Sequence, residues 1–442
     1  MPISNEIRRI TVEDIRFPYA SLGAGADANN PDPDYSNALV TLVTDEGEGA
    51  GVGFTLGRGN EMVCAAVREL APRLIGRSVD EIVDGFAAVW RELANPPQSR
   101  WIAPGGGPYH MAAAAITNAL FDLWAKQRRL PLWKALAALT PERITAMLDF
   151  RYVDHVLSRE EALEILRDRV EGRADRIREL ESGGLPCYHT TWIGSGTGEL
   201  LDQIEEVSER RGITTFKVKV GRELSHDRER LSAIRRRFGD SLALLTDANQ
   251  VWSVREAIEW MRALAEYEIG WIEEPTAPDQ VDGHRRIREG LAGTGIEVVT
   301  GENCPNSHVA AQFIAGGAVD RFQIDACRVM GPPENILIML VAAKYGVPIC
   351  PHAGGSGLDE LVPHLAGFHY ACIAPSSERM IVEQVGFCAD YFVAPAAVRD
   401  GRVAAPSEPG YLVGMRPEAV ARYRYPDGPG WQTGPTNQSH GS

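Results

Sequence analysis

The stretch TTFKVKVGRELSHDRERLSAIRRRFGDSLALLTD, residues 214–247, contains a short apolar strand, a charged amphipathic helix and a second apolar strand. Two strands that are joined by a helix of this length pair in parallel, because the helix returns the chain to the edge where the first strand began. We therefore expect an α/β structure with a parallel sheet around this stretch.

The same alternation continues on both sides of it. Further helical patterns cover Val254–Tyr267 and Pro333–Gly346. Including the two above, strands are predicted at Ile144–Phe150, Thr214–Val220, Leu242–Asp247, Ile269–Glu274, Ile296–Gly301, Arg321–Ala326, Val347–Pro351 and Met380–Val385. Eight strands that alternate with helices are typical of a TIM barrel. The interval 151–213 is long and is expected to hold a helix and additional segments.

The first third of the chain has a different pattern. NALVTLVT (Asn37–Thr44), a turn of glycine and acidic residues and the returning GVGFTLG predict a β-hairpin. Apolar residues recur at helical spacing from Asn60 to Leu93, and Met111–Lys126 is an alanine-rich segment apolar enough for a buried helix. From about Tyr425 the apolar periodicity ends, which predicts an extended tail.

Composition and charge restrict the class of partner. The 442 residues include 60 acidic and 45 basic ones, for a net charge of −15, which disfavours nucleic acid and anionic lipid. No stretch approaches the ~18 apolar residues of a membrane span, and residues 1–15 lack the apolar core of a signal peptide. The 7 cysteines are scattered without a CxxC pair. We expect a soluble, cytoplasmic protein with a small-molecule partner.

Polar residues occupy the C-terminal ends of the predicted barrel strands, where the active sites of TIM barrels lie. They are Lys217, Lys219, Asp247, Glu273, Glu274, Glu302, Asp325, His352 and Glu383. Side chains alternate along a strand, so Lys217 and Lys219 point to the same side. Any single one of these residues could instead cap a helix or line a solvated edge. Their coincidence at seven strand ends favours a functional site.

Three of the acidic strand ends indicate a metal site. Asp247, one of Glu273 and Glu274, and Glu302 follow one another at intervals of about one βα unit. Carboxylates held together repel one another unless a cation lies between them, and oxygen ligands favour Mg²⁺ before Ca²⁺. Zinc is disfavoured because the chain has no HxH, HExxH or CxxC motif, and GxxxxGK[ST] is also absent.

The other histidines lack a polar partner at a strand end. Most of them are expected at the surface or in the core, and only His189 and His110 are weak candidates for contact with a substrate. The glycines at Gly354–Gly357 follow His352 and could let backbone amides approach an anion.

These motifs resemble the mandelate racemase branch of the enolase superfamily, and most closely the group of L-fuconate dehydratases. The resemblance covers nearly the whole chain. The matching motifs include KVKVG, WIEEPT, TGE and QIDA. DANQ, EEPT and PHAGG are motifs of the whole superfamily, and NPDPDYS (Asn30–Ser36), FTLGRGN (Phe54–Asn60) and DFRY (Asp149–Tyr152) are more specific to the narrower group. It implies a modified (β/α)7β barrel at 141–390 under an N-terminal α+β capping domain at 1–140, with 391–442 returning to that domain and ending in the tail. It also implies a homo-oligomer.

The resemblance further implies a role for each strand-end residue. Asp247, Glu273 and Glu302 correspond to the Mg²⁺ ligands. Lys219, beside Lys217, corresponds to the base that removes the proton α to a carboxylate, and a neighbouring cation and the metal are expected to lower its pKa. His352 with Asp325 corresponds to the acid, and protonated Glu383 to the group that hydrogen-bonds the enediolate. Loops of the capping domain select the substrate, and expected contacts are Asp27, Tyr35, Asn249 and His189.

The activity implied is dehydration of a sugar acid, L-fuconate or a stereochemical relative, to a 2-keto-3-deoxy acid. A racemase or epimerase with the same site is the alternative, because Lys219 and His352 could exchange the α-proton without elimination. A catalytically silent sugar-acid binding protein ranks lower, since no strand-end residue is lost. The residue after Glu302 is Asn303, where the resembling group is expected to have histidine, and Tyr188–Gly198 also differs and could form a pocket wall. Both differences leave the substrate's stereochemistry open.

Overall fold

The computed structural model describes residues 5–18, 25–31, 34–103, 105–192 and 196–432. At one end of the described structure an antiparallel sheet is formed by β1 (Arg9–Phe17), β2 (Tyr35–Thr44) and β3 (Gly47–Thr55), in the order β1-β2-β3. The hairpin predicted from Asn37–Thr44 and the returning strand is confirmed as β2 and β3, which pair from Thr44 opposite Gly47. β1 was not predicted.

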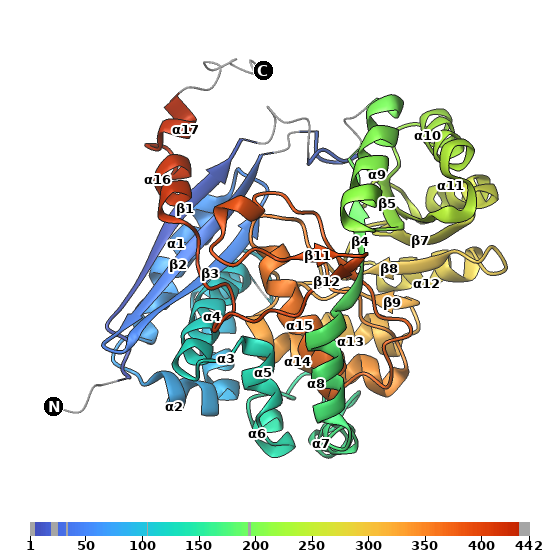
Figure 1. The fold of residues 1–442 in the computed structure, drawn as a ribbon. Coiled ribbons are helices and arrows are strands. Elements are labelled where there is room, and N and C mark those ends of the chain that lie inside the picture. The colour runs from blue at the N-terminus through green and yellow to red at the C-terminus, as the bar shows by residue number, and fades with distance from the viewer. Residues whose placement is uncertain (1–4, 19–24, 32–33, 104, 193–195, 433–442) are drawn as a thin grey trace.

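Helices cover this sheet (Figure 1). α1 (Asn60–Leu70), α2 (Val79–Asp84) and α3 (Phe86–Ala94) divide the helical pattern that was predicted for residues 60–93. The predicted alanine-rich helix is confirmed as α4 (Pro108–Gln127), whose residues from His110 to Ala125 are buried. α4 packs against β3, because glycines on the strand and alanines on the helix let the two backbones approach closely.

The barrel begins after α5 (Leu132–Ala137), α6 (Pro141–Ala146), α7 (Arg159–Asp168) and α8 (Arg173–Gly183). Its parallel strands are β4 (Leu185–Thr190), β5 (Thr215–Lys219), β6 (Ala243–Asp247), β7 (Ile269–Glu273), β8 (Glu297–Thr300) and β9 (Arg321–Phe322). Ile349 then forms a parallel bridge to Phe322. β10 (Val382–Glu383) pairs in parallel with β4, so that the last barrel strand lies beside the first.

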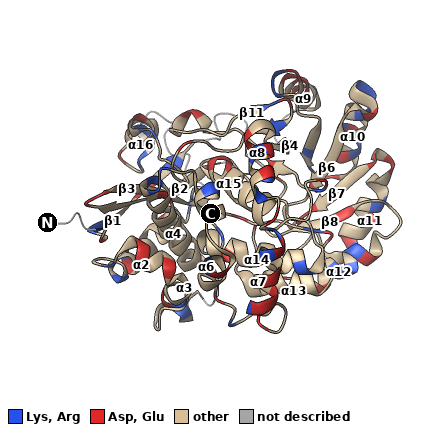
Figure 2. Cartoon of the chain, turned by 60° about the horizontal axis from the view of Figure 1, so that its bottom comes forward, with Lys and Arg blue, Asp and Glu red and all other residues tan. Residues whose placement is uncertain are grey.

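The helices between these strands are α9 (Thr197–Arg211), α10 (Leu224–Phe238), α11 (Val254–Leu264), α12 (Val281–Gly290), α13 (Ser307–Ala315), α14 (Gly331–Tyr345) and α15 (Leu358–Cys372). The described residues thus give the (β/α)7β order. Local signals set the helix ends: Ser253 caps α11 in a capping box with Glu256, and α9 ends at Gly212 in a left-handed conformation. Figure 2 shows basic and acidic residues together on α10 and α11, as expected for solvated faces.

The predicted strand Ile144–Phe150 is wrong. Residues 141–146 form α6, in which Thr140 accepts a hydrogen bond from the Arg143 amide and Pro141 occupies the first position. The apolar residues Ile144, Met147 and Leu148 have the spacing of a helix, and a short apolar run does not by itself distinguish a strand from a buried helix. The first barrel strand is instead β4, inside the interval that was expected to hold a helix and extra segments.

Four of the other predicted strands agree with β5 to β8 within one or two residues. The predictions at 321–326, 347–351 and 380–385 fall at the correct places in the barrel, but their ladders are short. Asp325 and His352 follow directly after two of these short ladders and line the cavity at the barrel mouth.

The last part of the chain returns to both sheets. β11 (Val398–Arg399) and β12 (Arg402–Val403) form a hairpin that pairs antiparallel with β4. α16 (Pro417–Tyr423) and α17 (Pro429–Gln432) lie by β1 (Figure 1), where the Trp431 indole donates to the Arg16 carbonyl at 3.0 Å. The extended tail expected from Tyr425 is therefore wrong for residues 425–432, and residues 433–442 lie outside the described ones. The domain limits at 140 and 390 stay predictions.

None of the described helices is both long and apolar enough to cross a membrane.

The contact between β3 and α4 gives a testable prediction. A Cβ at Gly51 would lie 2.3 Å from the Ala115 carbonyl oxygen, whereas a Cβ at Gly53 would lie 3.0 Å from the Met111 carbonyl oxygen. We expect Gly51→Ala to lower the free energy of unfolding by roughly 2–3 kcal/mol, because the backbone of α4 must shift. Gly53→Ala, the matched control, should cost less. Urea titrations of the two variants measure this, and equal midpoints would contradict the packing described.

Candidate active site

A cavity of about 290 Å³ opens at the C-terminal ends of the barrel strands. The N-terminal sheet and its loops form its other wall, through Tyr35, Phe54 and Leu56. Of the residues predicted from the strand ends, those that line it are Lys217, Lys219, Glu274, Glu302, Asp325, His352 and Glu383. The barrel thus brings residues from distant parts of the sequence to one cavity, as the strand-end pattern predicts.

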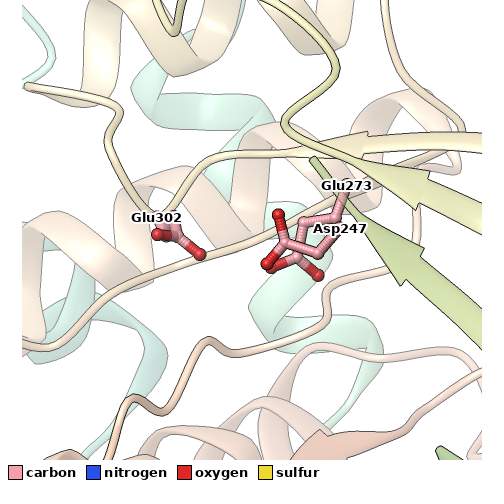
Figure 3. A group of neighbouring side chains, drawn as sticks. All are labelled: Asp247, Glu273 and Glu302. Atoms are coloured by element: carbon pink, nitrogen blue, oxygen red, sulfur yellow. The ribbon is translucent and has the colours of Figure 1, made fainter. Parts of the chain in front are cut away.

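Three carboxylates converge beside this cavity. Asp247 and Glu273 end the neighbouring strands β6 and β7, where they are register partners, and Glu302 follows β8. One oxygen of each lies within 4.8 Å of the others, and Figure 3 shows Glu302 facing the adjacent pair. Gly301 permits this approach: it has φ +142, and a Cβ there would lie 2.1 Å from the Gln323 carbonyl oxygen.

This donor set fits a hard divalent cation. All three ligand groups are carboxylates, and Asp247 and Glu273 are completely buried. Oε2 of Glu273 is buried without a hydrogen-bond partner among the described residues, as expected for an oxygen that a cation would satisfy. The sequence left Glu273 and Glu274 as alternatives, and the structure places Glu273 in the cluster.

The two lysines of β5 both contact carboxylates of the site, and Nζ of Lys217 lies 3.5 Å from Oδ2 of Asp247, the nearest partner of Lys219. Nζ of Lys217 lies 2.5 Å from Oε1 of Glu273 and 2.8 Å from Oε1 of Glu383, and it is completely buried. Nζ of Lys219 lies 2.5 Å from Oδ2 of Asp247 and 2.9 Å from Oδ1 of Asn249. Burial opposes the charge of Lys219, but Asp247 outweighs it and raises the pKa. The lowering of this pKa that was expected is therefore not found, because the Asp247 carboxylate favours the charged ammonium group.

His352 and Asp325 form a hydrogen-bonded pair. Nδ1 of His352 lies 2.6 Å from Oδ2 of Asp325, whose Oδ1 accepts from the backbone amides of Cys327 and Arg328 at 2.6 and 2.8 Å. Burial lowers the pKa of His352, but Glu302 and then Asp325 outweigh it and raise the pKa to about 10. The imidazole is therefore protonated at neutral pH, and its Nε2 faces the site at 3.4 Å from Glu302.

Glu383 is held from three directions. Its Oε1 accepts from Lys217 and from the Thr190 hydroxyl, and its Oε2 accepts from the Ala353 amide at 2.8 Å. Burial raises the pKa of this carboxyl, but Lys217 and then His352 outweigh burial and lower it. The protonated Glu383 that was expected is therefore wrong for this arrangement, because two cationic side chains favour the carboxylate.

Three of the four expected substrate contacts line the cavity: Asp27, Tyr35 and Asn249. His189 does not. Tyr188 and Thr190 face the barrel interior, so the intervening His189 faces outward, where it packs on Phe216 and its Nδ1 lies 3.0 Å from the Gln384 carbonyl. The imidazole is buried there, which lowers its pKa to about 4.

The sequence interpretation missed part of the cavity wall. Thr190 and Trp192 belong to the end of β4, the strand that was not predicted, although Tyr188–Gly198 was named as a possible wall. Arg328 was also missed, and its Nη2 donates to Oδ1 of Asn303 at 2.7 Å. The preceding Asp325 was the available signal, since residues that follow a strand end enter the same mouth.

Asn303 connects Arg328 to Glu274. Its Nδ2 donates to Oε1 of Glu274 at 2.9 Å, and Gln250 donates to both oxygens of Glu274 at 3.0 Å. Burial, and then the charge of Glu302, raise the pKa of Glu274 to about 8. The Glu274 carboxylate thus accepts hydrogen bonds from two amide side chains and is not part of the cluster of Asp247, Glu273 and Glu302.

Comparisons with known proteins show the family of this chain. A family model of the mandelate racemase / muconate lactonizing enzyme N-terminal domain matches residues 34–137, and a model of the enolase C-terminal domain-like family matches residues 199–419. L-galactonate dehydratase of Hypocrea jecorina is 42% identical, over 95% of this chain and 94% of that protein.

Solved structures of related proteins have the same fold. The crystal structure of human mitochondrial enolase superfamily member 1 has a TM-score of 0.95 and 40% identity, and the match covers 97% of this chain and 98% of that one. L-talarate/galactarate dehydratase from Salmonella typhimurium LT2, liganded with Mg and L-lyxarohydroxamate, shares the fold with a TM-score of 0.73 at 24% identity, over 95% and 92% of the two chains.

The cluster predicts which carboxylates bind a metal. We expect Glu273→Gln to weaken Mg²⁺ binding by at least about tenfold, because it removes one of three charged ligands. Glu274→Gln, the matched control at the next position, should have a smaller effect, since the Glu274 carboxylate already has amide partners. Isothermal titration calorimetry measures both affinities. A larger loss in Glu274→Gln would show that the ligand is the other glutamate.

Proposed function

Since the chain belongs to the enolase superfamily, in the group of mandelate racemase and muconate lactonizing enzyme, we propose that it is a Mg²⁺-dependent dehydratase of sugar acids. The observation that carries the proposal is one cavity lined by a lysine and a histidine–aspartate pair, beside which three carboxylates converge. The names of relatives support the substrate class, since L-galactonate dehydratase and L-talarate/galactarate dehydratase both act on sugar acids.

The first step is removal of the proton α to the substrate carboxylate. Lys219 is the proposed base, because its Nζ lies at the cavity beside Asp247. A cation bound by Asp247 would reduce the pull of that carboxylate on the ammonium group and so favour the neutral amine that a base requires. Mg²⁺ held by Asp247, Glu273 and Glu302 would supply positive charge to the substrate carboxylate as it becomes an enediolate. Lys217 adds a fixed positive charge on the same side, where Glu273 and Glu383 hold its ammonium group.

The second step is loss of the 3-hydroxyl. Protonated His352 is the proposed acid, and Asp325 fixes the orientation of its ring through Nδ1. The C3–O bond breaks, the hydroxyl takes the proton of Nε2, and water leaves. The remaining enol tautomerises to a 2-keto-3-deoxy acid, so that atoms and charges balance across the two steps.

The narrower proposal for the substrate is L-fuconate or a stereochemical relative. L-Fuconate is 6-deoxy-L-galactonate, so it has the configuration of the acid after which the Hypocrea jecorina relative is named. Asp27 and Asn249 line the cavity and offer oxygen and amide groups to the hydroxyls of such a chain. Homo-oligomerisation and a cytoplasmic location, which were expected from the sequence, stay predictions.

The proposal is tested by incubating the protein and Mg²⁺ with L-fuconate, L-galactonate, galactarate and D-gluconate. We expect a 2-keto-3-deoxy product from at least one of them, detected as its semicarbazone, and no product in the presence of EDTA. Recovery of an epimerised acid without a keto product would favour the racemase or epimerase instead. Binding of an acid sugar without α-proton exchange in D₂O would favour a silent binding protein.

Two substitutions separate the two proposed steps. Lys219→Ala should abolish both α-proton exchange and dehydration while Mg²⁺ binding persists. His352→Asn should keep exchange in D₂O but slow dehydration by on the order of 10²-fold or more, because only the departure of the hydroxyl needs its proton. His226→Asn, on the outer helix α10, serves as the control. Proton NMR at C2 measures exchange, and persistent exchange in Lys219→Ala would show that the base is another residue.

A further inference from the structure

A completely buried arginine lies behind the proposed base. Arg230 belongs to α10, and its guanidinium donates through Nη1 to the Lys219 carbonyl at 2.8 Å and through Nη2 to the Trp192 carbonyl at 2.9 Å. The Lys219 carbonyl ends β5, and the Trp192 carbonyl lies two residues beyond the end of the neighbouring strand β4. One side chain therefore ties together two segments whose side chains both line the cavity.

The geometry of the strands explains why a donor is needed there. Carbonyls two residues apart on a strand face the same side. The Lys217 carbonyl faces β4, where it accepts from the Thr191 amide at 2.8 Å and from the Thr191 hydroxyl at 3.0 Å. The Lys219 carbonyl faces the same side, but the β4 ladder ends at Thr190. Arg230 supplies the donor that a longer strand would provide, and a buried carbonyl without one is costly.

A second residue of α10 holds the next turn of the chain. Oδ2 of Asp227 accepts from the Gly221 amide at 2.9 Å and from the Trp260 indole at 3.0 Å, and Asp227 is also completely buried. Asp227 and Arg230 are three residues apart, so they lie on the same face of the helix. Together they hydrogen-bond to the backbone on both sides of Val220, the residue that follows the proposed base.

We propose that Arg230 is a positioning residue for Lys219, which sets the place of its ammonium group by fixing the backbone carbonyl of the same residue. Arg230 touches neither the cavity nor the three carboxylates, so its effect passes through Lys219 and Trp192. Nζ of Lys219 lies 5.5 Å from the centre of the Trp192 ring, and both positions depend on the same guanidinium. Proton transfer falls steeply when the base is displaced by about 1 Å. This inference rests on the proposed function.

The same helix contains a matched control. Arg235 also uses its guanidinium to hold backbone carbonyls, with 2.9 Å to Gly239, 2.8 Å to Leu242, 3.0 Å to Tyr267 and 3.2 Å to Glu268. These carbonyls precede β6 and β7, at the end of the barrel opposite the cavity. Loss of Arg235 therefore removes the same kind of interaction without reaching the site.

The test compares Arg230→Met, Arg230→Lys and Arg235→Met in dehydration of the sugar acid that the wild type turns over. We expect Arg230→Met to lower kcat by on the order of 10–100-fold with KM changed less than about threefold. The kinetic isotope effect with substrate deuterated at C2 should rise, because proton removal becomes slower. Arg230→Lys should recover part of kcat. Arg235→Met should keep kcat and the isotope effect near those of the wild type at 25 °C, even if its Tm falls.

Equal changes of kcat in Arg230→Met and Arg235→Met, or an unchanged isotope effect in Arg230→Met, would overturn the proposal and leave a purely structural arginine. If Arg230→Met does not fold, Arg230→Lys carries the comparison, since it keeps the charge and loses the fork of donors. Crystal structures of the Arg230 variants should show Lys219 displaced from Asp247, and an unmoved Lys219 overturns the proposal. This readout holds even if the wild type dehydrates no sugar acid, a result that would refute the proposed function alone.

Discussion

Mutual repulsion among buried carboxylates is the constraint on which this structure depends. Four carboxylates meet at the barrel mouth: those of Asp247, Glu273, Glu302 and Glu383. Burial of such charges costs free energy unless positive charges compensate them. Lys217 compensates part of this negative charge, because its ammonium group contacts both Glu273 and Glu383. Oε2 of Glu273 has no hydrogen-bond partner among the described residues and therefore remains available to a cation. The chemistry that we propose uses this incomplete compensation.

The surrounding fold serves mainly to hold these groups at fixed distances. Backbone donors orient the acidic side chains: the Ala353 amide holds Glu383, and two amides hold Asp325. Behind β5, side chains of a helix hold the backbone itself. Residues with rigid supports of this kind lose little entropy when substrate binds, and they keep the geometry on which proton transfer depends.

Sequence reasoning located most of the site because barrel topology converts order along the chain into proximity. Asp247, at the end of a regular strand, lies where that rule predicts, whereas the rule alone left Glu273 and Glu274 as alternatives. It failed where the local pattern was ambiguous: ITAMLDF has apolar residues at helical spacing, so a helix replaced the predicted first strand and β4 was missed. His189 was misjudged for the same reason, since its direction depends on the register of that unpredicted strand. Charge states also escaped prediction, because the pKa of Glu383 depends on two cations from other strands.

The return of the C-terminal segment to both sheets affects the order in which the protein is completed during synthesis. β10 supplies the partner of β4, and Trp431 reaches the strand that contains Arg16, so each sheet is completed by residues that follow it much later in the sequence. A nascent chain that has emerged as far as α14 has an open barrel edge at β4, with unpaired backbone groups exposed to other chains.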